Sequence, residues 1–184
     1  YYSEEAWTWE LLALTRLRPV AGDAAFGERI AGVDRAALAL ARDPAKIRAD
    51  VTDMRARMER ERAAKSIWDL KLAPGGFVDI EFIAQALQVM HAAEHPDVLC
   101  ANTGEAIAAL TEAGMLDRAQ AARLGAAWRL WSDLQQTLRI CVDGEFEPGL
   151  ASPALQARLA SVSGGETIEA LETKVRAAQG EARA

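Results

Sequence analysis

Two acidic residues one position apart, Asp79 and Glu81, have a spacing that could support metal chemistry. On a β-strand, alternate side chains share one face, so these two carboxylates would lie together. Paired carboxylates of this kind hold the metal ions of many phosphoryl and nucleotidyl transferases. A strand over residues 77–83 would therefore predict an active site at this point of the chain.

The same stretch also fits the start of a helix. Apolar residues recur every three or four positions at Ile80, Ile83, Leu87 and Met90, and this pattern holds for about fourteen residues, against seven for the strand pattern. On a helix, Asp79 and Glu81 would lie about 160° apart and could not share a metal ion. The longer pattern favours the helix, and no metal-binding residues are expected.

On the helical interpretation, Glu81, Gln85 and Gln88 form a polar stripe beside the apolar one. This stripe is either a solvated face or a surface that faces another domain. Gly75 and Gly76 directly precede the helix, with Lys71 just upstream. The backbone N–H groups of such a turn could face a phosphate group, because a helix N-terminus favours anions. The alternative is a tight turn that only begins the helix.

The elements that would position these residues are all helices. Start signals at Asp23, Asp43-Pro44, Asn102, Asp117 and Ser152-Pro153 resemble N-caps, two of them followed by proline. The periodicity predicts helices over residues 3–17, 24–41, 44–66, 102–113, 117–142 and 166–178, with a short one after Ser152. We therefore expect an all-α fold, an antiparallel helical bundle, in a single domain over residues 1–184.

Composition narrows the classes of function. The net charge of −6 argues against a free-standing nucleic-acid-binding domain, which is usually basic. No apolar stretch is long enough to span a membrane. Cys100 and Cys141 form no C-x-x-C pair, so both are expected to be free thiols in a reducing cytoplasm. The chain starts at Tyr1 in helix-like sequence, and we expect it to be a fragment of a longer chain.

Two long motifs resemble a known family. Residues 68–85, WDLKLAPGGFVDIEFIAQ, resemble the D-x-K-x-G-x-G-G-[IL]-x-D-I-E-F-x-x-Q signature of glutamine synthetase adenylyltransferases. Residues 6–23, AWTWELLALTRLRPVAGD, resemble the A-W-T-W-E-x-x-A-L-x-R-x-R-x-x-x-G-D segment that follows the adenylylating nucleotidyltransferase domain of those enzymes. Ala73-Pro74 replaces the first glycine of the signature, which is the main departure.

The resemblance implies that the chain is the helical domain, of the GlnD PII-uridylyltransferase type, that follows the adenylylating domain. The family's enzymes transfer AMP from ATP to a tyrosine of glutamine synthetase, and remove it by phosphorolysis in the other half. Mg²⁺ and ATP are the implied cofactors of the full-length enzyme. The preceding nucleotidyltransferase domain, glutamine synthetase and the signal protein PII are the implied partners.

The catalytic G-S motif and the strand-borne D-x-D of the family do not occur in this chain. We therefore expect no catalytic residue, no bound cofactor and no transferase activity in this fragment alone. The residues expected to face nucleotide or an interface are Arg16, Arg18, Lys71, Gly75, Gly76, Glu81 and Gln85. The alternative is a module that binds PII or glutamine synthetase without touching nucleotide. The five tryptophans are expected in the core. Glu10 is either buried or paired with an arginine, or functional, and the sequence does not decide between these alternatives.

Overall fold

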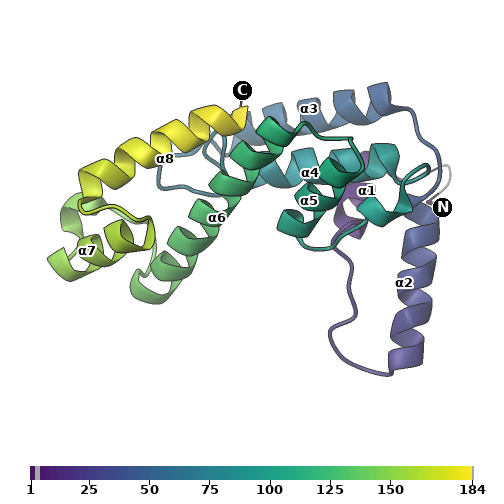
Figure 1. The fold of residues 1–184 in the computed structure, drawn as a ribbon, viewed down its shortest axis with the longest axis horizontal. Helices are drawn as coiled ribbons and strands as arrows, with labels where there is room; N and C mark the ends of the chain where they lie inside the picture. The colour runs from purple at the N-terminus through teal and green to yellow at the C-terminus, as the bar shows by residue number, and fades with distance from the viewer. Residues whose placement is uncertain (3–4, 184) are drawn as a thin grey trace. The chain divides into compact units, whose positions relative to one another are not determined.

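The computed structural model describes residues 1–2 and 5–183, and in this part of the chain it contains helices and no strand. The all-α prediction is confirmed (Figure 1). The α-helices are α1 (Thr8–Leu14), α2 (Ala24–Leu38), α3 (Pro44–Glu61), α4 (Phe77–His91), α5 (Thr103–Glu112), α6 (Arg118–Cys141), α7 (Pro153–Val162) and α8 (Ile168–Arg183), with 3₁₀ turns η1 (Pro96–Val98) and η2 (Pro148–Leu150).

The predicted N-caps explain where several helices begin. The Asp23 carboxylate accepts the N–H of Phe26, and the Asn102 side chain accepts the N–H groups of Gly104 and Glu105. Each bond satisfies a backbone donor that the first helical turn leaves open. The first helix is shorter than predicted: it begins at Thr8, and the predicted start at Ser3 lies outside the described residues.

Helix α4 resolves the ambiguity at Asp79 and Glu81. The segment is helical from Phe77, so the strand interpretation is wrong. Asp79 lies in the first turn and Glu81 two residues later, on a different side of the helix. The helical apolar pattern, which holds for about fourteen residues, therefore predicted the local structure better than the shorter strand pattern.

The chain divides into two compact units. Unit 1 comprises Tyr1–Arg57 and Glu81–Ala121, and unit 2 comprises Met58–Ile80 and Ala122–Ala184. Each unit is thus built from two separate stretches of sequence. The arrangement as one antiparallel bundle stays a prediction.

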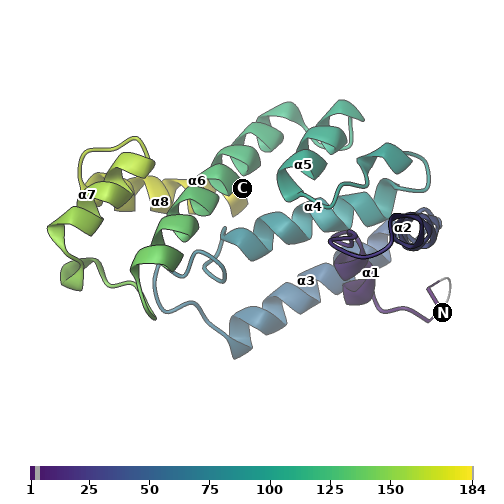
Figure 2. The same cartoon turned by 90° about the horizontal axis from the view of Figure 1, so that it is seen from below.

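Unit 1 is held together by a small apolar core. Buried side chains from α1, α2, α3 and α4 and from the loop after η1 meet there, and Figure 2 shows α1 beside α3. They are Leu11, Leu12, Leu38, Ile47, Ala86, Val89, Ala92 and Leu99. Outside this core, Thr8 on α1 donates a hydrogen bond to Asp50 on α3, which ties the two helices together.

Unit 2 has its core between α6, α7, α8 and the segment before α4. Trp131 on α6 is fully buried, as are Leu159 on α7 and Val175 on α8. Helices α7 and α8 lie side by side (Figures 1 and 2). Two aromatic pairs meet edge to face: Phe77 with Trp128, and Trp68 with Phe146, with ring centroids 4.9 Å and 4.8 Å apart.

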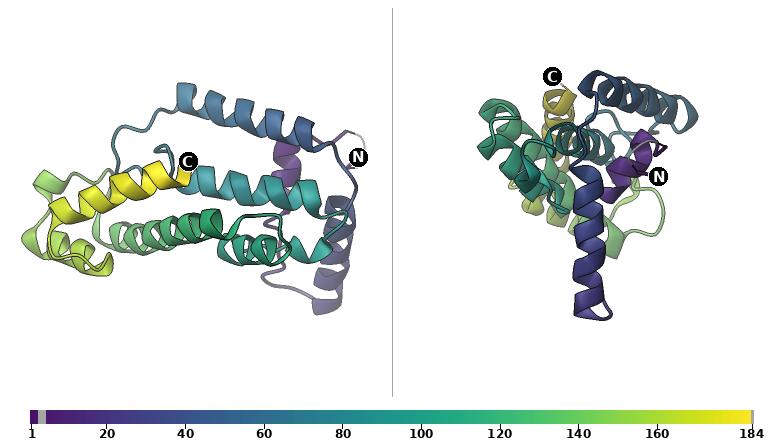
Figure 3. Two further views of the ribbon diagram at one scale, coloured as in Figure 1. Left: turned by 45° about the horizontal axis from the view of Figure 1, so that its top comes forward. Right: turned by 90° about the vertical axis from the view of Figure 1, so that its right-hand side faces the viewer.

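Helix α2 extends away from the rest of unit 1 (Figures 1 and 3). Only Leu38 at its C-terminal end is buried, while Phe26 and Val33 are 58% and 65% exposed. On the same helix, Asp34 has one carboxylate oxygen that is buried without a hydrogen-bond partner among the described residues. Burial raises the pKa of the Asp34 carboxyl from 3.8 to about 6, against a smaller opposing effect of Arg35.

This carboxyl should make stability depend on pH. Because its pKa is higher in the folded than in the unfolded chain, the folded state holds the proton more tightly. The free energy of unfolding should therefore fall as pH rises from about 4 to about 6, and then level off. Urea unfolding at pH 4, 5, 6 and 7 measures this, and Asp34→Asn should flatten the fall. Glu28→Gln, an exposed change on the same helix, is the control, and an equal flattening there would contradict the assignment.

Candidate functional site

An ion pair joins two of the predicted site residues. Arg16, just after α1, pairs through Nη1 with the Glu81 carboxylate on α4. Both residues belong to unit 1, and their side chains are 45% and 22% exposed. Arg16 and Glu81 come from the two separate sequence motifs, so this pair is where the motifs meet. Arg18 is exposed two residues further on, in the loop before Pro19.

The polar stripe of α4 is not a solvated face. Gln85 and Gln88 are buried, with 7% and 1% of their surface exposed. The Gln88 side-chain oxygen accepts the N–H of Cys100 at 2.9 Å, which links α4 to the loop after η1. The solvated-face alternative is therefore wrong for these two glutamines, and Glu81 is the residue of the three that reaches solvent. A nucleotide- or interface-facing role of Gln85 stays a prediction.

The glycine turn before α4 uses its own N–H groups internally. The N–H of Gly75 bonds to the Asp79 carboxylate, and that of Gly76 bonds to the carbonyl of Ala73 at 2.8 Å. The next two N–H groups, of residues 77 and 78, bond to carbonyls of residues 70 and 71 at 2.8 and 3.2 Å. A phosphate at this turn would have to compete with these acceptors, so the geometry describes a closed turn that begins a helix.

Packing explains why this turn needs glycine. Gly75 has φ +79°, and a Cβ built on it would lie 2.1 Å from the backbone oxygen of Gln179 on α8. A Cβ on Gly76 would lie 2.5 Å from the carbonyl oxygen of Leu70. The indole N–H of Trp131 donates to the Gly75 carbonyl at 3.1 Å, and the Gln179 amide donates to the carbonyl of Ile67 at 3.0 Å. The turn is thus the point where α6 and α8 contact the segment before α4.

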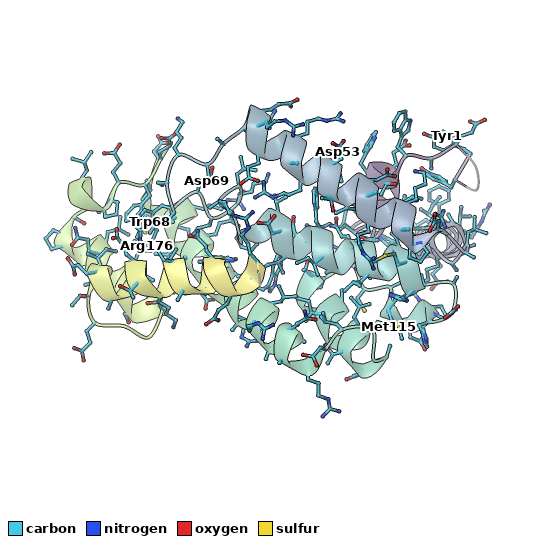
Figure 4. The ribbon with its side chains drawn as sticks, turned by 90° about the horizontal axis from the view of Figure 1, so that it is seen from above. Tyr1, Asp53, Trp68, Asp69, Met115 and Arg176 are labelled. Carbon is cyan, nitrogen blue, oxygen red and sulfur yellow. The ribbon has the colours of Figure 1, made fainter. Side chains whose placement is uncertain are left out.

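Lys71 lies apart from this turn, on the surface of unit 2. Lys71 is exposed, and it lines a cleft together with Trp68 and Asp69. Figure 4 labels Trp68 and Asp69, which lie on the segment between α3 and α4. Arg16 and Glu81 are therefore brought together in unit 1, whereas Lys71, Gly75 and Gly76 are in unit 2. A role of all these residues at one nucleotide stays a prediction.

A polar network at the start of α1 was missed by the sequence interpretation. The Tyr1 hydroxyl donates to the Glu10 carboxylate at 2.6 Å, and the N–H of Trp7 donates to the same carboxylate at 2.8 Å. These bonds lower the pKa of the Glu10 carboxyl, and they raise that of the Tyr1 hydroxyl to about 12. Glu10 is thus a capping residue at the third helical position, not a partner of arginine. A glutamate at this position is typical of a helix N-terminus, so the sequence could have predicted this role.

The five tryptophans differ in exposure, and Trp128 is half-buried. Trp68 and Trp131 are buried, as expected, but Trp7 and Trp9 are 70% and 56% exposed. Both cysteines are free, as predicted. Among the described residues, no group of three or more His, Cys, Asp or Glu side chains is arranged to hold a metal ion. Within the same part of the chain, no helix has both the length and the apolar composition required to cross a lipid bilayer.

Comparison with known proteins agrees with these motifs. A family model described as GlnD PII-uridylyltransferase matches residues 45–182. A protein of Bradyrhizobium diazoefficiens is 45% identical over 183 residues, and one of Caulobacter vibrioides is 49% identical over 185 residues. Both are named bifunctional glutamine synthetase adenylyltransferase/adenylyl-removing enzyme. The alignments cover 100% of this chain but only 18% and 19% of those relatives, so the chain spans about a fifth of their length. The chain belongs to the family described as GlnD PII-uridylyltransferase, in the form that occurs in glutamine synthetase adenylyltransferases.

Proposed function

We propose that this chain is a helical domain of a bifunctional enzyme that attaches AMP to glutamine synthetase and removes it again. In this proposal the domain positions substrate for a nucleotidyltransferase domain that precedes it in the longer protein, in the cytoplasm. The similarity to the named relatives over the whole chain supports the reaction class. The ion pair between Arg16 and Glu81 carries the residue assignment, because it joins the two motifs at a partly exposed point.

Mg²⁺ and ATP are assigned to the neighbouring domain in this proposal. The two carboxylates that could have formed a magnesium pair do not fit one, because each has a different partner. Asp79 accepts the N–H of Gly75, and Glu81 pairs with Arg16. We therefore expect the 184 residues alone to show no AMP transfer to glutamine synthetase.

The test is made in the full-length enzyme that carries this chain. Arg16→Ala should raise the KM for ATP about tenfold, equivalent to about 1.4 kcal/mol of lost binding, with a smaller change in kcat. Arg29→Ala, an exposed arginine on α2, is the matched control and should leave both constants unchanged. Steady-state adenylylation of glutamine synthetase provides the readout. An unchanged KM in Arg16→Ala would remove the nucleotide-facing role.

A second function, an interaction module that touches no nucleotide, is favoured by one observation. Helix α2 carries Phe26, Ile30 and Val33 at helical spacing, all at least 40% exposed, and α1 exposes Trp7 and Trp9. Exposed apolar side chains that gather on one face commonly mark a protein contact. On this view, Phe26→Ser with Val33→Ser would weaken binding of glutamine synthetase or PII to the full-length enzyme, with the KM for ATP unchanged.

A further inference from the structure

Unit 2 contains a cleft that the proposed function does not use. Its volume is about 990 Å³, at the upper end of the range for small-molecule sites. It is lined by the segment between α3 and α4, and by the C-terminal part of α6 and the loop after it. All of its lining residues belong to unit 2, so the cleft depends on that unit alone.

Four cationic side chains line the cleft: Arg62, Lys65, Lys71 and Arg139. The chain as a whole carries a net charge of −6, so a group of four cations has the opposite sign to the overall charge. Lys65 pairs with Glu145 across the cleft. Among the described residues, the side chains of the other three make no hydrogen bond or ion pair. Three unpaired cations around one concave surface repel each other, and an anion between them would relieve that repulsion.

The lining also carries three acidic residues, Asp69, Glu145 and Glu147, so its cations exceed its carboxylates by one. The Asp69 carboxylate accepts the N–H of Leu72 at 3.0 Å and keeps its negative charge, which also acts on Lys65. Glu145 is committed to Lys65, whose pKa it raises through their hydrogen bond. Glu147 is the remaining acidic residue of the lining. Outside the pair of Lys65 and Glu145, the lining therefore carries three cations and two carboxylates.

The aromatic residues of the cleft hold its walls together and are not exposed for stacking. The rings of Trp68 and Phe146 meet edge to face, and the two residues are only 8% and 9% exposed. This contact fixes the loop after α6 against the segment before α4. A ligand of this cleft would consequently be recognised by charge and hydrogen bonding and not by an aromatic platform.

We propose that this cleft binds a small polyanion that carries phosphate groups. A chain of phosphates carries several anionic groups, so it could contact more than one of the unpaired cations that line the cleft, whereas a single carboxylate is suited to one of them. The guanidinium groups of Arg62 and Arg139 match phosphate oxygens with paired N–H donors. The ligand is either a free oligophosphate or the phosphate chain of a nucleotide.

Isothermal titration of the chain with inorganic triphosphate at low ionic strength tests the proposal. We expect saturable binding at one site that weakens as NaCl is raised. Arg62→Ala and Arg139→Ala should each weaken it at least fivefold, and Arg139→Lys should restore part of the loss. Arg158→Ala on α7 and Arg176→Ala on α8 remove exposed arginines of the same unit outside the cleft, and both should bind like the parent chain. Equal melting temperatures show that the variants remain folded.

Parallel titrations distinguish the two sources of phosphate. Equal affinity for triphosphate and ATP indicates a site that reads phosphates alone, and tighter binding of ATP indicates a nucleotide site. The proposal is overturned by absence of saturable binding, by equal losses in the control variants, or by saturable binding of a glutamate decapeptide without binding of triphosphate. Arg16 lies in unit 1 and is not part of this cleft. Absence of triphosphate binding would therefore leave the KM test of the proposed function unaffected, and an unchanged KM in Arg16→Ala would leave the cleft proposal unaffected.

Discussion

Replacing Gly75 by alanine should lower the free energy of unfolding by more than about 3 kcal/mol. The added Cβ would lie 2.1 Å from the Gln179 oxygen and 2.7 Å from that residue's carbonyl carbon, and both atoms belong to backbone that cannot rotate away. The positive φ of +79° adds the steric cost of the left-handed region for a non-glycine residue. Chemical denaturation followed by circular dichroism measures the loss.

Gly164→Ala is the matched control for this change. Gly164 also lies in unit 2 and has nearly the same φ, +76°, but a Cβ there meets nothing within 4 Å. It should lose only the conformational part, about 1 kcal/mol. The difference between the two variants measures the contact with α8. Similar losses in both would show that α8 does not lie against this turn.

Trp131→Ala should be the second most damaging substitution, with an expected loss of about 3–5 kcal/mol. The side chain is fully buried on α6, so its removal leaves a cavity in the core of unit 2. It also leaves the Gly75 carbonyl without the indole N–H that it accepts at 3.1 Å. Thermal and urea unfolding both report this loss.

Two further variants separate the contributions of packing and hydrogen bonding. Trp131→Phe keeps an aromatic ring but removes the N–H donor and part of the buried volume, so its loss should be smaller than that of Trp131→Ala and combines the bond to Gly75 with a smaller cavity. Trp9→Ala removes an indole that is 56% exposed, and should change stability by less than about 1 kcal/mol. A Trp9 variant as unstable as the Trp131 variant would mean that the exposed indole contributes to the core.

The helix starts could be predicted because their causes are local. Asp23 and Asn102 bond to N–H groups two or three residues away, so the sequence window contains both partners. The apolar period of α4 is local in the same sense. The expected all-α fold follows from such signals, and it is confirmed.

The surroundings that the local sequence could not predict depend on partners far along the chain, or on the lack of a partner among the described residues. Gln88 is buried because its partner is the N–H of Cys100, beyond η1. The close packing of Gly75 was not predictable from its neighbours in sequence, because the residue that it contacts, Gln179, is in the last helix. Trp7 and Trp9 were expected in the core because they are aromatic, but no described segment of this chain covers them. The ion pair between Arg16 and Glu81 spans 65 residues, and only the similarity to a family suggested that its two ends were related.

The order of synthesis bears on how unit 2 is completed. By the time residue 121 has left the ribosome, every residue of unit 1 has emerged, but of unit 2 only the first stretch, Met58–Ile80, has emerged. The glycine turn of that stretch must wait for α8, since Gln179 bonds to Ile67 across 112 positions. Closing so long a loop makes this a late, slow event compared with the local helices. The nascent chain therefore matures from unit 1 to unit 2, with the Gly75 turn among the last contacts to form.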